Sequence, residues 1–63
     1  MKIYRFWAFN EESFLMRGTL EEAGEYREKI NAKRRDGHFL FEEVTEAEAE
    51  GNDVPDLEAA LAE

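Results

Sequence analysis

One serine and one histidine are the residues of this 63-residue chain that could form a catalytic nucleophile–base pair, because it has no cysteine. Any serine–histidine–acid arrangement would therefore need both Ser13 and His38. Ser13 falls in a predicted turn, where serine commonly bonds to the backbone. His38 follows Gly37, the predicted end of a helix, where a polar residue needs no special role. We therefore expect no catalytic residue and no enzymatic activity.

Carboxylates are abundant, but their positions favour neither acid–base nor metal chemistry. A catalytic carboxylate is typically buried with a shifted pKa. Glu42 and Glu43 come closest, directly after an apolar run, and we expect them to be solvated charges at a strand end. Residues 48–56 supply the oxygen ligands that Ca²⁺ prefers, but the spacing of an EF-hand loop is missing. The sequence indicates no metal site and no cofactor.

Aromatic residues raise the alternative of nucleic-acid binding. A sheet that carries Tyr4, Phe6, Phe39 and Phe41 could stack bases, as RNA-recognition sheets do. However, this binding depends on neutralising phosphates, and the second aromatic strand continues into acidic residues. We favour core packing for these rings and expect no direct contact with nucleic acid. Binding of single-stranded RNA through these four rings is kept as a hypothesis, ranked behind the two that are given at the end of this section.

Charge is distributed unevenly along the chain. All eight Lys and Arg residues lie at or before Arg35, whereas residues 36–63 contain ten acids and no base. A surface of one sign attracts basic partners and repels nucleic acid and anionic lipid. Alternate carboxylates on a strand lie about 6.6 Å apart, within twofold of the ~3.4 Å rise between phosphates of one DNA strand. The predicted partner-binding residues are Glu42, Glu43, Glu46, Glu48, Glu50, Asp53, Asp56 and Glu58.

The elements that must position these acids begin with a hairpin. Residues 2–9 are aromatic and β-branched and are apolar on both faces, which predicts a central strand. Residues 10–13 are expected to form a polar turn, and residues 14–17 a short second strand.

A helix should follow the hairpin. Thr19 and Glu22 form a capping box, and the helix is predicted to run from about Leu20 to Arg35. Gly37 is its expected left-handed cap. The stripe predicted to face the sheet consists of Leu20, Ala23, Tyr26 and Ile30.

The C-terminal half is predicted to begin with a strand over residues 38–44. Residues 45–51 fit either a strand or a helical turn, and we favour the turn because Ala and Glu are poor strand formers. In that case Thr45 and Glu48 make a second capping box, and Gly51 ends the turn. Residues 54–56 could start a last short helix with Leu57, Ala60 and Leu61 facing inward, and this segment could equally fray.

The predicted fold is a single small α+β domain with the order β-β-α-β. A helix that returns over the sheet makes the third strand parallel to the second, and both flank the first in the order 2-1-3. Residues 1–45 form the core, and residues 46–63 form an acidic segment that packs on it or extends from it. The sheet face without the helix must be closed by this segment, by a second copy in a homodimer, or by a target.

Two resemblances accompany these features. The entry from Gly18 to Ala23 into a helix, after a hairpin and before a strand, resembles the HicB antitoxin family. In size, charge and the acids from Glu42 to Glu58, the chain resembles small acidic phage-borne anti-CRISPR and anti-restriction proteins. Several of those act as DNA mimics against basic nucleic-acid channels, which implies a non-enzymatic inhibitor.

The leading hypothesis is therefore an inhibitor whose acidic surface blocks a basic nucleic-acid-binding protein or complex. The alternative is an antitoxin-like protein that neutralises a toxin by stoichiometric binding. No stretch approaches the ~18 apolar residues of a membrane span, and the N-terminus lacks the pattern of a signal peptide. We expect a monomer or homodimer in the cytoplasm of a bacterial host cell, without a membrane partner.

Overall fold

The computed structural model describes residues 1–35 and 38–63, and within them the chain forms a small α+β domain. The elements are β1 (Lys2–Ala8), β2 (Glu11–Gly18), α1 (Leu20–Asn31), β3 (Leu40–Val44), α2 (Glu46–Ala49) and α3 (Leu57–Leu61). The strands form one sheet in the order β2-β1-β3, with both outer strands antiparallel to β1. The predicted fold class and sheet order are confirmed.

The hairpin between β1 and β2 is tighter than predicted. Ala8 pairs with Glu11, so the turn contains only Phe9 and Asn10, and β2 begins at Glu11 instead of residue 14. Asn10 adopts a left-handed φ of 66°, which asparagine tolerates better than most residues. The register shifts between Phe6 and Ala8. Residues 11–13, which were expected to belong to a longer turn, are therefore part of the strand.

Helix α1 begins as predicted but ends earlier. The Thr19 hydroxyl accepts a hydrogen bond from the Glu22 amide, and the Glu22 carboxylate accepts one from the Thr19 amide, which completes the capping box. The helix ends at Asn31 instead of Arg35. The Asn31 amide bonds to both backbone groups of Phe39, at 2.7 Å to its N–H and 3.2 Å to its carbonyl. The predicted cap at Gly37 lies outside the described residues.

The hydrogen bonds between Asn31 and Phe39 also explain where the third strand begins, which is Leu40 instead of His38. The Phe39 carbonyl also accepts a hydrogen bond from Arg27 Nε at 2.9 Å. Because α1 holds the Phe39 backbone in this way, that residue pairs with the helix before the chain enters the sheet.

The main core lies between α1 and the sheet. Its buried residues are Tyr4, Phe6, Ala8, Met16, Ala23, Phe39 and Leu57, and Tyr26 and Ile30 pack against them. Leu20 was expected to join this stripe but is 64% exposed. It occupies the first position of α1.

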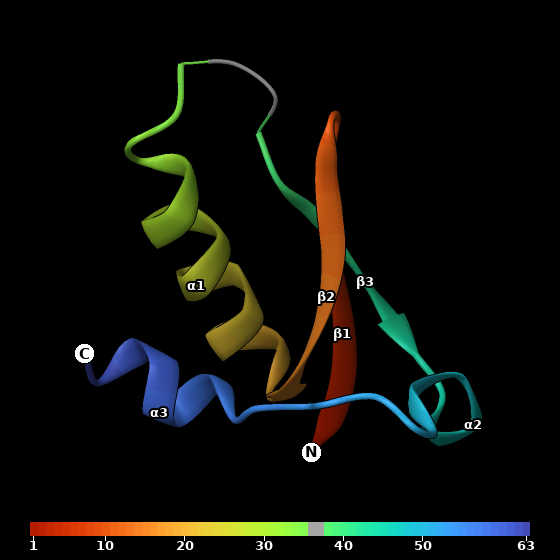
Figure 1. Cartoon of the computed structure of the whole chain (residues 1–63). Helices are drawn as coiled ribbons and strands as arrows, with labels where there is room; N and C mark the ends of the chain where they lie inside the picture. Colours follow the sequence, from red (N-terminus) through yellow and green to blue (C-terminus); the bar gives the residue numbers. More distant parts are fainter. Residues whose placement is uncertain (36–37) are drawn as a thin grey trace.

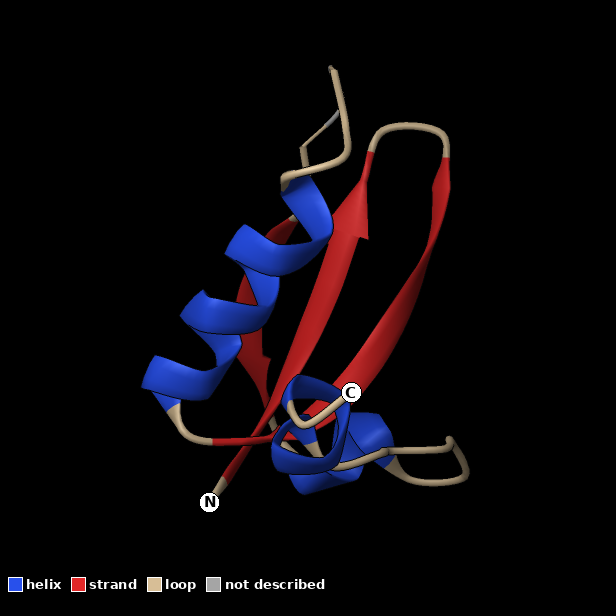
Figure 2. Ribbon diagram, turned by 90° about the vertical axis from the view of Figure 1, so that its left-hand side faces the viewer, coloured by secondary structure: helices blue, strands red, loops and turns tan. Residues whose placement is uncertain are grey.

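The C-terminal segment divides between the two sides of the sheet (Figure 1). α3 lies beside α1 on the helical side, where Leu57 is fully buried. Figure 2 shows both helices in front of the sheet. Lys29 ties them together, because its Nζ donates to the Ala60 and Glu63 carbonyls, both at 3.1 Å. The helix predicted after Pro55 is therefore present and packed.

α2 lies on the other side of the sheet from α1 and α3, at one end of it. Ala49 packs there with Ile3 and Val44, and Leu15 and Val54 border this small cluster. The rest of that side carries no helix (Figure 1). We call it the open face and define it by Arg5, Trp7, Leu15, Leu40 and Glu42, which alternation and strand pairing place together. Among the described residues, no helix has the length and apolar character to cross a bilayer.

Candidate partner-binding surface

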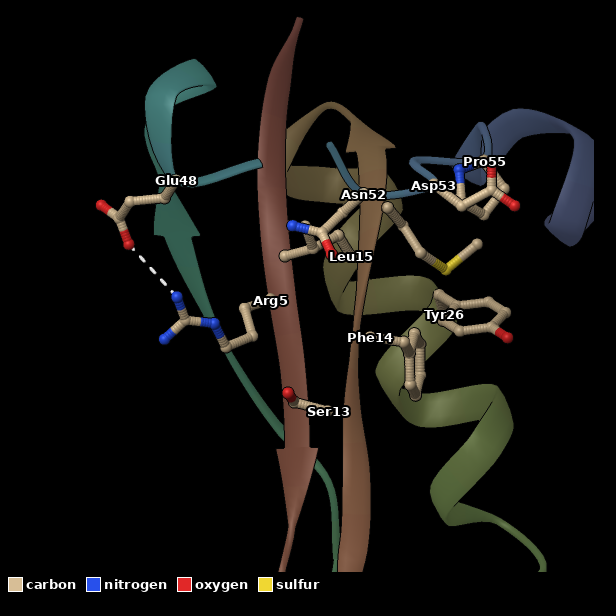
Figure 3. A pocket seen from close by; sticks show the side chains of 10 residues that line it. Arg5, Ser13, Phe14, Leu15, Tyr26, Glu48, Asn52, Asp53 and Pro55 are labelled. Carbon is tan, nitrogen blue, oxygen red and sulfur yellow. Dashed lines mark hydrogen bonds and ion pairs between the residues drawn. The ribbon is translucent and has the colours of Figure 1, made fainter. Parts of the chain in front are cut away.

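Arg5 joins acidic residues from two elements on the open face. It lies opposite Glu42 in the β1–β3 pairing, and its Nη1 donates to Glu42 Oε2 at 3.0 Å. Its Nη2 donates to Glu48 Oε2 of α2 at 3.2 Å (Figure 3). One planar guanidinium thus contacts two carboxylates, a geometry for which arginine is well suited. Arg5 holds α2 against the sheet.

Arg17 makes the second contact with α2. Its Nη1 donates to Glu46 Oε1 at 2.9 Å. This hydrogen bond and the attraction between the charges raise the pKa of Arg17 and lower the pKa of Glu46. The nearby Asp56 carboxylate also favours the charged guanidinium. Both arginines therefore come from the basic half of the chain and contact its acidic half.

The local sequence explains why α2 forms at this position. The Thr45 hydroxyl accepts a hydrogen bond from the Glu48 amide at 3.2 Å, which caps the helix. The predicted capping box is incomplete, since the Glu48 carboxylate bonds to Arg5 and to the Thr45 hydroxyl. Gly51, with a φ of 81°, follows the turn. The helical interpretation of this segment is confirmed.

Six of the eight predicted residues gather around the two arginines. Glu48 and Asp53 line one groove with Arg5, while Glu46 and Glu50 line another with Arg17. Asp56 lies opposite Arg17 in a parallel bridge. We call this group the acidic surface; it consists of Glu42, Glu46, Glu48, Glu50, Asp53 and Asp56. With two guanidinium groups among six carboxylates, it keeps a formal surplus of four negative charges.

The other two predicted residues lie elsewhere. Glu43 follows Glu42 on a strand and therefore faces the helical side, opposite Tyr4, where it pairs with Lys2 at 3.2 Å. Glu58 lies in the first turn of α3. The eight acids do not form one continuous row.

Next to the acidic surface, the open face carries an apolar pair. Trp7 pairs with Leu40 across β1 and β3 on the open face, and Leu40 is 48% exposed. Phe9 at the hairpin is 81% exposed. Leu57, by contrast, belongs to the core.

The other chemistry considered from the sequence finds little support in the geometry. Tyr4, Phe6 and Phe39 are at least 92% buried, since their exposed fractions are 3%, 0% and 8%. These rings pack in the core and are not available to stack bases. In the described part of the chain, no group of three or more His, Asp or Glu side chains is arranged to hold a metal ion.

Sequence reasoning also missed the two arginines. Period-two alternation places Arg5 on the same face as Trp7, a signal that was present in the sequence. The register that brings Arg5 opposite Glu42 was not, because these two residues lie on strands that are far apart in the sequence. Compared with known proteins, the chain matches no protein-family model, and a search of curated proteins finds no significant match.

Proposed function

We propose that this protein is a non-enzymatic inhibitor whose acidic surface occupies the basic nucleic-acid-binding site of a partner, such as a bacterial defence complex. One observation supports this above all: the negative charge on the acidic surface exceeds what Arg5 and Arg17 compensate. The surplus is held on ordered elements, α2 and the segment that follows it, and its field attracts cationic partners.

The energetics fit a charged surface with an apolar anchor. An exposed ion pair contributes only about 0.2–1 kcal/mol, so several pairs together add a few kcal/mol and mainly accelerate association. Most interface affinity comes from desolvated aromatic and apolar groups. Trp7 and Leu40 supply such groups beside the acids.

The internal ion pairs determine which residues should be substituted. Glu48 pairs with Arg5 and Glu46 pairs with Arg17, so replacing either would loosen α2 as well as remove charge. Glu42 pairs with Arg5 between β3 and β1, so its replacement would also break an internal contact. Glu50 and Asp53 are exposed and take part in no ion pair within the described ranges. The variant Glu50→Gln/Asp53→Asn therefore lowers the negative charge by two units without breaking an internal contact.

The matched control is Glu21→Gln/Glu25→Gln, which makes the same charge change on the exposed surface of α1. Both variants and the unmodified protein are immobilised and exposed to a nuclease-treated bacterial lysate. We expect the unmodified protein and the control to retain a basic protein that added duplex DNA displaces, and the acidic-surface variant to retain at least several-fold less. Equal retention by both variants would show that the acidic surface is not the binding site.

A further inference from the structure

The outer edge of β2 is paired at only one point in the described part of the chain. Arg17 donates its backbone N–H to the Pro55 carbonyl at 2.9 Å, and the C-terminal segment makes a single parallel bridge there, between Arg17 and Asp56. Backbone groups in an antiparallel strand alternate in direction. Leu15, two residues earlier, therefore presents its amide and carbonyl on the same outer side, where no described residue pairs with them.

A groove of about 550 Å³ runs along this unpaired edge (Figure 3). Residues from both faces of β2 line it, which happens only where a groove follows the edge of a sheet. Phe14 and Tyr26 lie on the helical side, and Leu15 lies on the open-face side. Asn52, Asp53 and Pro55 lie at the end where the C-terminal segment crosses. The groove thus combines free backbone groups, apolar walls and a polar end.

The charges of the groove indicate what it accepts. Its acidic residues are Glu48 and Asp53, and its one base, Arg5, pairs with Glu48 and with Glu42, so Asp53 gives the lining an uncompensated negative charge. The partly exposed rings of Phe14 and Tyr26 can hold a cationic side chain over their faces. A second copy of this chain is disfavoured because each copy has a net charge of −8. The groove therefore fits a basic occupant.

We propose that an extended basic segment of the partner adds to β2 as a fourth strand, pairing with the backbone of Leu15 and continuing the position that the C-terminal segment takes at Arg17. This inference rests on the proposed function, since it names the part of the basic partner that is recognised. Side chains of an added strand alternate between faces. One set contacts Phe14 and Tyr26, while the other set lies over Leu15 near Glu48.

The test uses the full chain and an acetylated seven-residue peptide of alternating lysine and valine as the probe. Amide hydrogen exchange and chemical-shift changes are followed by NMR during titration. We expect exchange at the Leu15 amide to slow at least tenfold at saturation, because added strands bind through main-chain hydrogen bonds. The same peptide with all of its backbone amides N-methylated keeps its charge and should lose this protection, because neither edge of the extended peptide can then donate to β2. A peptide of alternating glutamate and valine should not bind.

A variant of the protein tests the same hydrogen bonds by removing a donor from β2 instead of from the peptide. Leu15→Pro removes an N–H that points away from β1, so the sheet keeps its internal pairing. Leu15→Ala is the matched control, because it shortens the side chain and keeps the amide. We expect only the proline variant to lose peptide binding. If circular dichroism shows that it does not fold, the N-methylated peptide decides the question.

Several results would overturn the inference. The first is equal binding of the N-methylated and the unmodified peptide, and the second is no binding of the unmodified peptide. The third is a set of chemical-shift changes confined to the open face. The fourth is protection of the Leu15 amide without peptide that grows with protein concentration. The last would indicate pairing between copies of this chain. Capture of a DNA-displaceable partner that Leu15→Pro does not weaken would refute the added strand and leave the proposed function intact. Conversely, peptide binding at β2 without such a partner would refute the function alone.

Discussion

Gly18 lies where β2, the start of α1 and α3 converge. A Cβ at this position would lie 2.9 Å from Leu57 Cβ, 2.8 Å from Leu57 Cδ1 and 2.7 Å from Glu22 Oε1. The Leu57 side chain is fully buried and has no room to withdraw. The glycine is therefore required by the close approach of α3, and not by an unusual backbone conformation.

We expect Gly18→Ala to destabilise the fold by about 1–3 kcal/mol, the usual cost of overpacking. Gly24→Ala is the matched control, because nothing lies within 4 Å of its added Cβ. Alanine is favoured over glycine inside a helix by roughly 0.5–1 kcal/mol, so this control should stabilise the protein. Urea unfolding measures both changes. Destabilisation of equal size in the two variants would contradict the packing of α3 against Gly18.

The ion pair between Arg17 and Glu46 predicts a pH-dependent contribution to stability. Because Arg17 lowers the pKa of Glu46 in the folded state, the pair stabilises the protein above the ordinary pKa of a glutamate. This contribution is lost as the pH falls through the lowered pKa of Glu46. Glu46→Gln should reduce the melting temperature at pH 7 by at most a few degrees, since the pair is exposed.

Thermal unfolding of the unmodified protein and Glu46→Gln across a series of acidic pH values tests this prediction. The two melting temperatures should converge under the most acidic conditions, where Glu46 is protonated. A difference that stays constant over the whole range would mean that the carboxylate charge does not hold α2 through Arg17.

At the scale of the elements, Asn31 determines where α1 ends and where β3 begins. Its amide bonds to the N–H and the carbonyl of Phe39, and Arg27 is a second donor to that carbonyl. In Asn31→Ala, the Phe39 N–H loses its partner while the carbonyl keeps one. An unsatisfied, partly buried donor costs about 1–3 kcal/mol, and we expect a loss of stability in this range.

Asn31→Asp separates the two hydrogen bonds, because aspartate can accept from the Phe39 N–H but cannot donate to its carbonyl. Its stability should fall between those of the unmodified protein and Asn31→Ala. Amide exchange at Phe39, measured by NMR, should be fastest in the alanine variant. Unchanged exchange in that variant would show that Asn31 does not fix the start of the strand.

These elements also show what the sequence alone could predict. The apolar pattern of residues 2–9 and the capping box at Thr19 depend on neighbouring residues, and both predict the observed structure. The end of α1 does not, because Asn31 acts through Phe39, which lies eight residues further along the chain. The extent of β2 was underestimated for a different, local reason, since the left-handed Asn10 shortens the turn.

The candidate site was likewise predictable from the sequence only in part. Its acids were evident from the charge pattern, but their distribution over two sheet faces follows from strand alternation at Glu42 and Glu43. The partnership of Arg5 and Arg17 with α2 required the three-dimensional fold.

At the scale of the whole molecule, folding partly reverses the separation of charge along the sequence. Arg5 and Arg17 from the N-terminal half contact acids of the C-terminal half, and Lys2 does so through Glu43. What remains is a smaller negative surplus, with the exposed Leu40 on the same sheet face as Arg5 and Glu42. The proposal depends on this combination of charge and apolar surface, more than on the total charge of the chain.

Competition with nucleic acid tests this proposal most directly. A fluorescent DNA duplex is bound to the captured partner, the protein is titrated in, and fluorescence anisotropy reports how much duplex remains bound. We predict complete displacement of the duplex, with Glu50→Gln/Asp53→Asn requiring a several-fold higher concentration than Glu21→Gln/Glu25→Gln. A stable ternary complex, in which the partner holds both the duplex and this protein, would contradict the account.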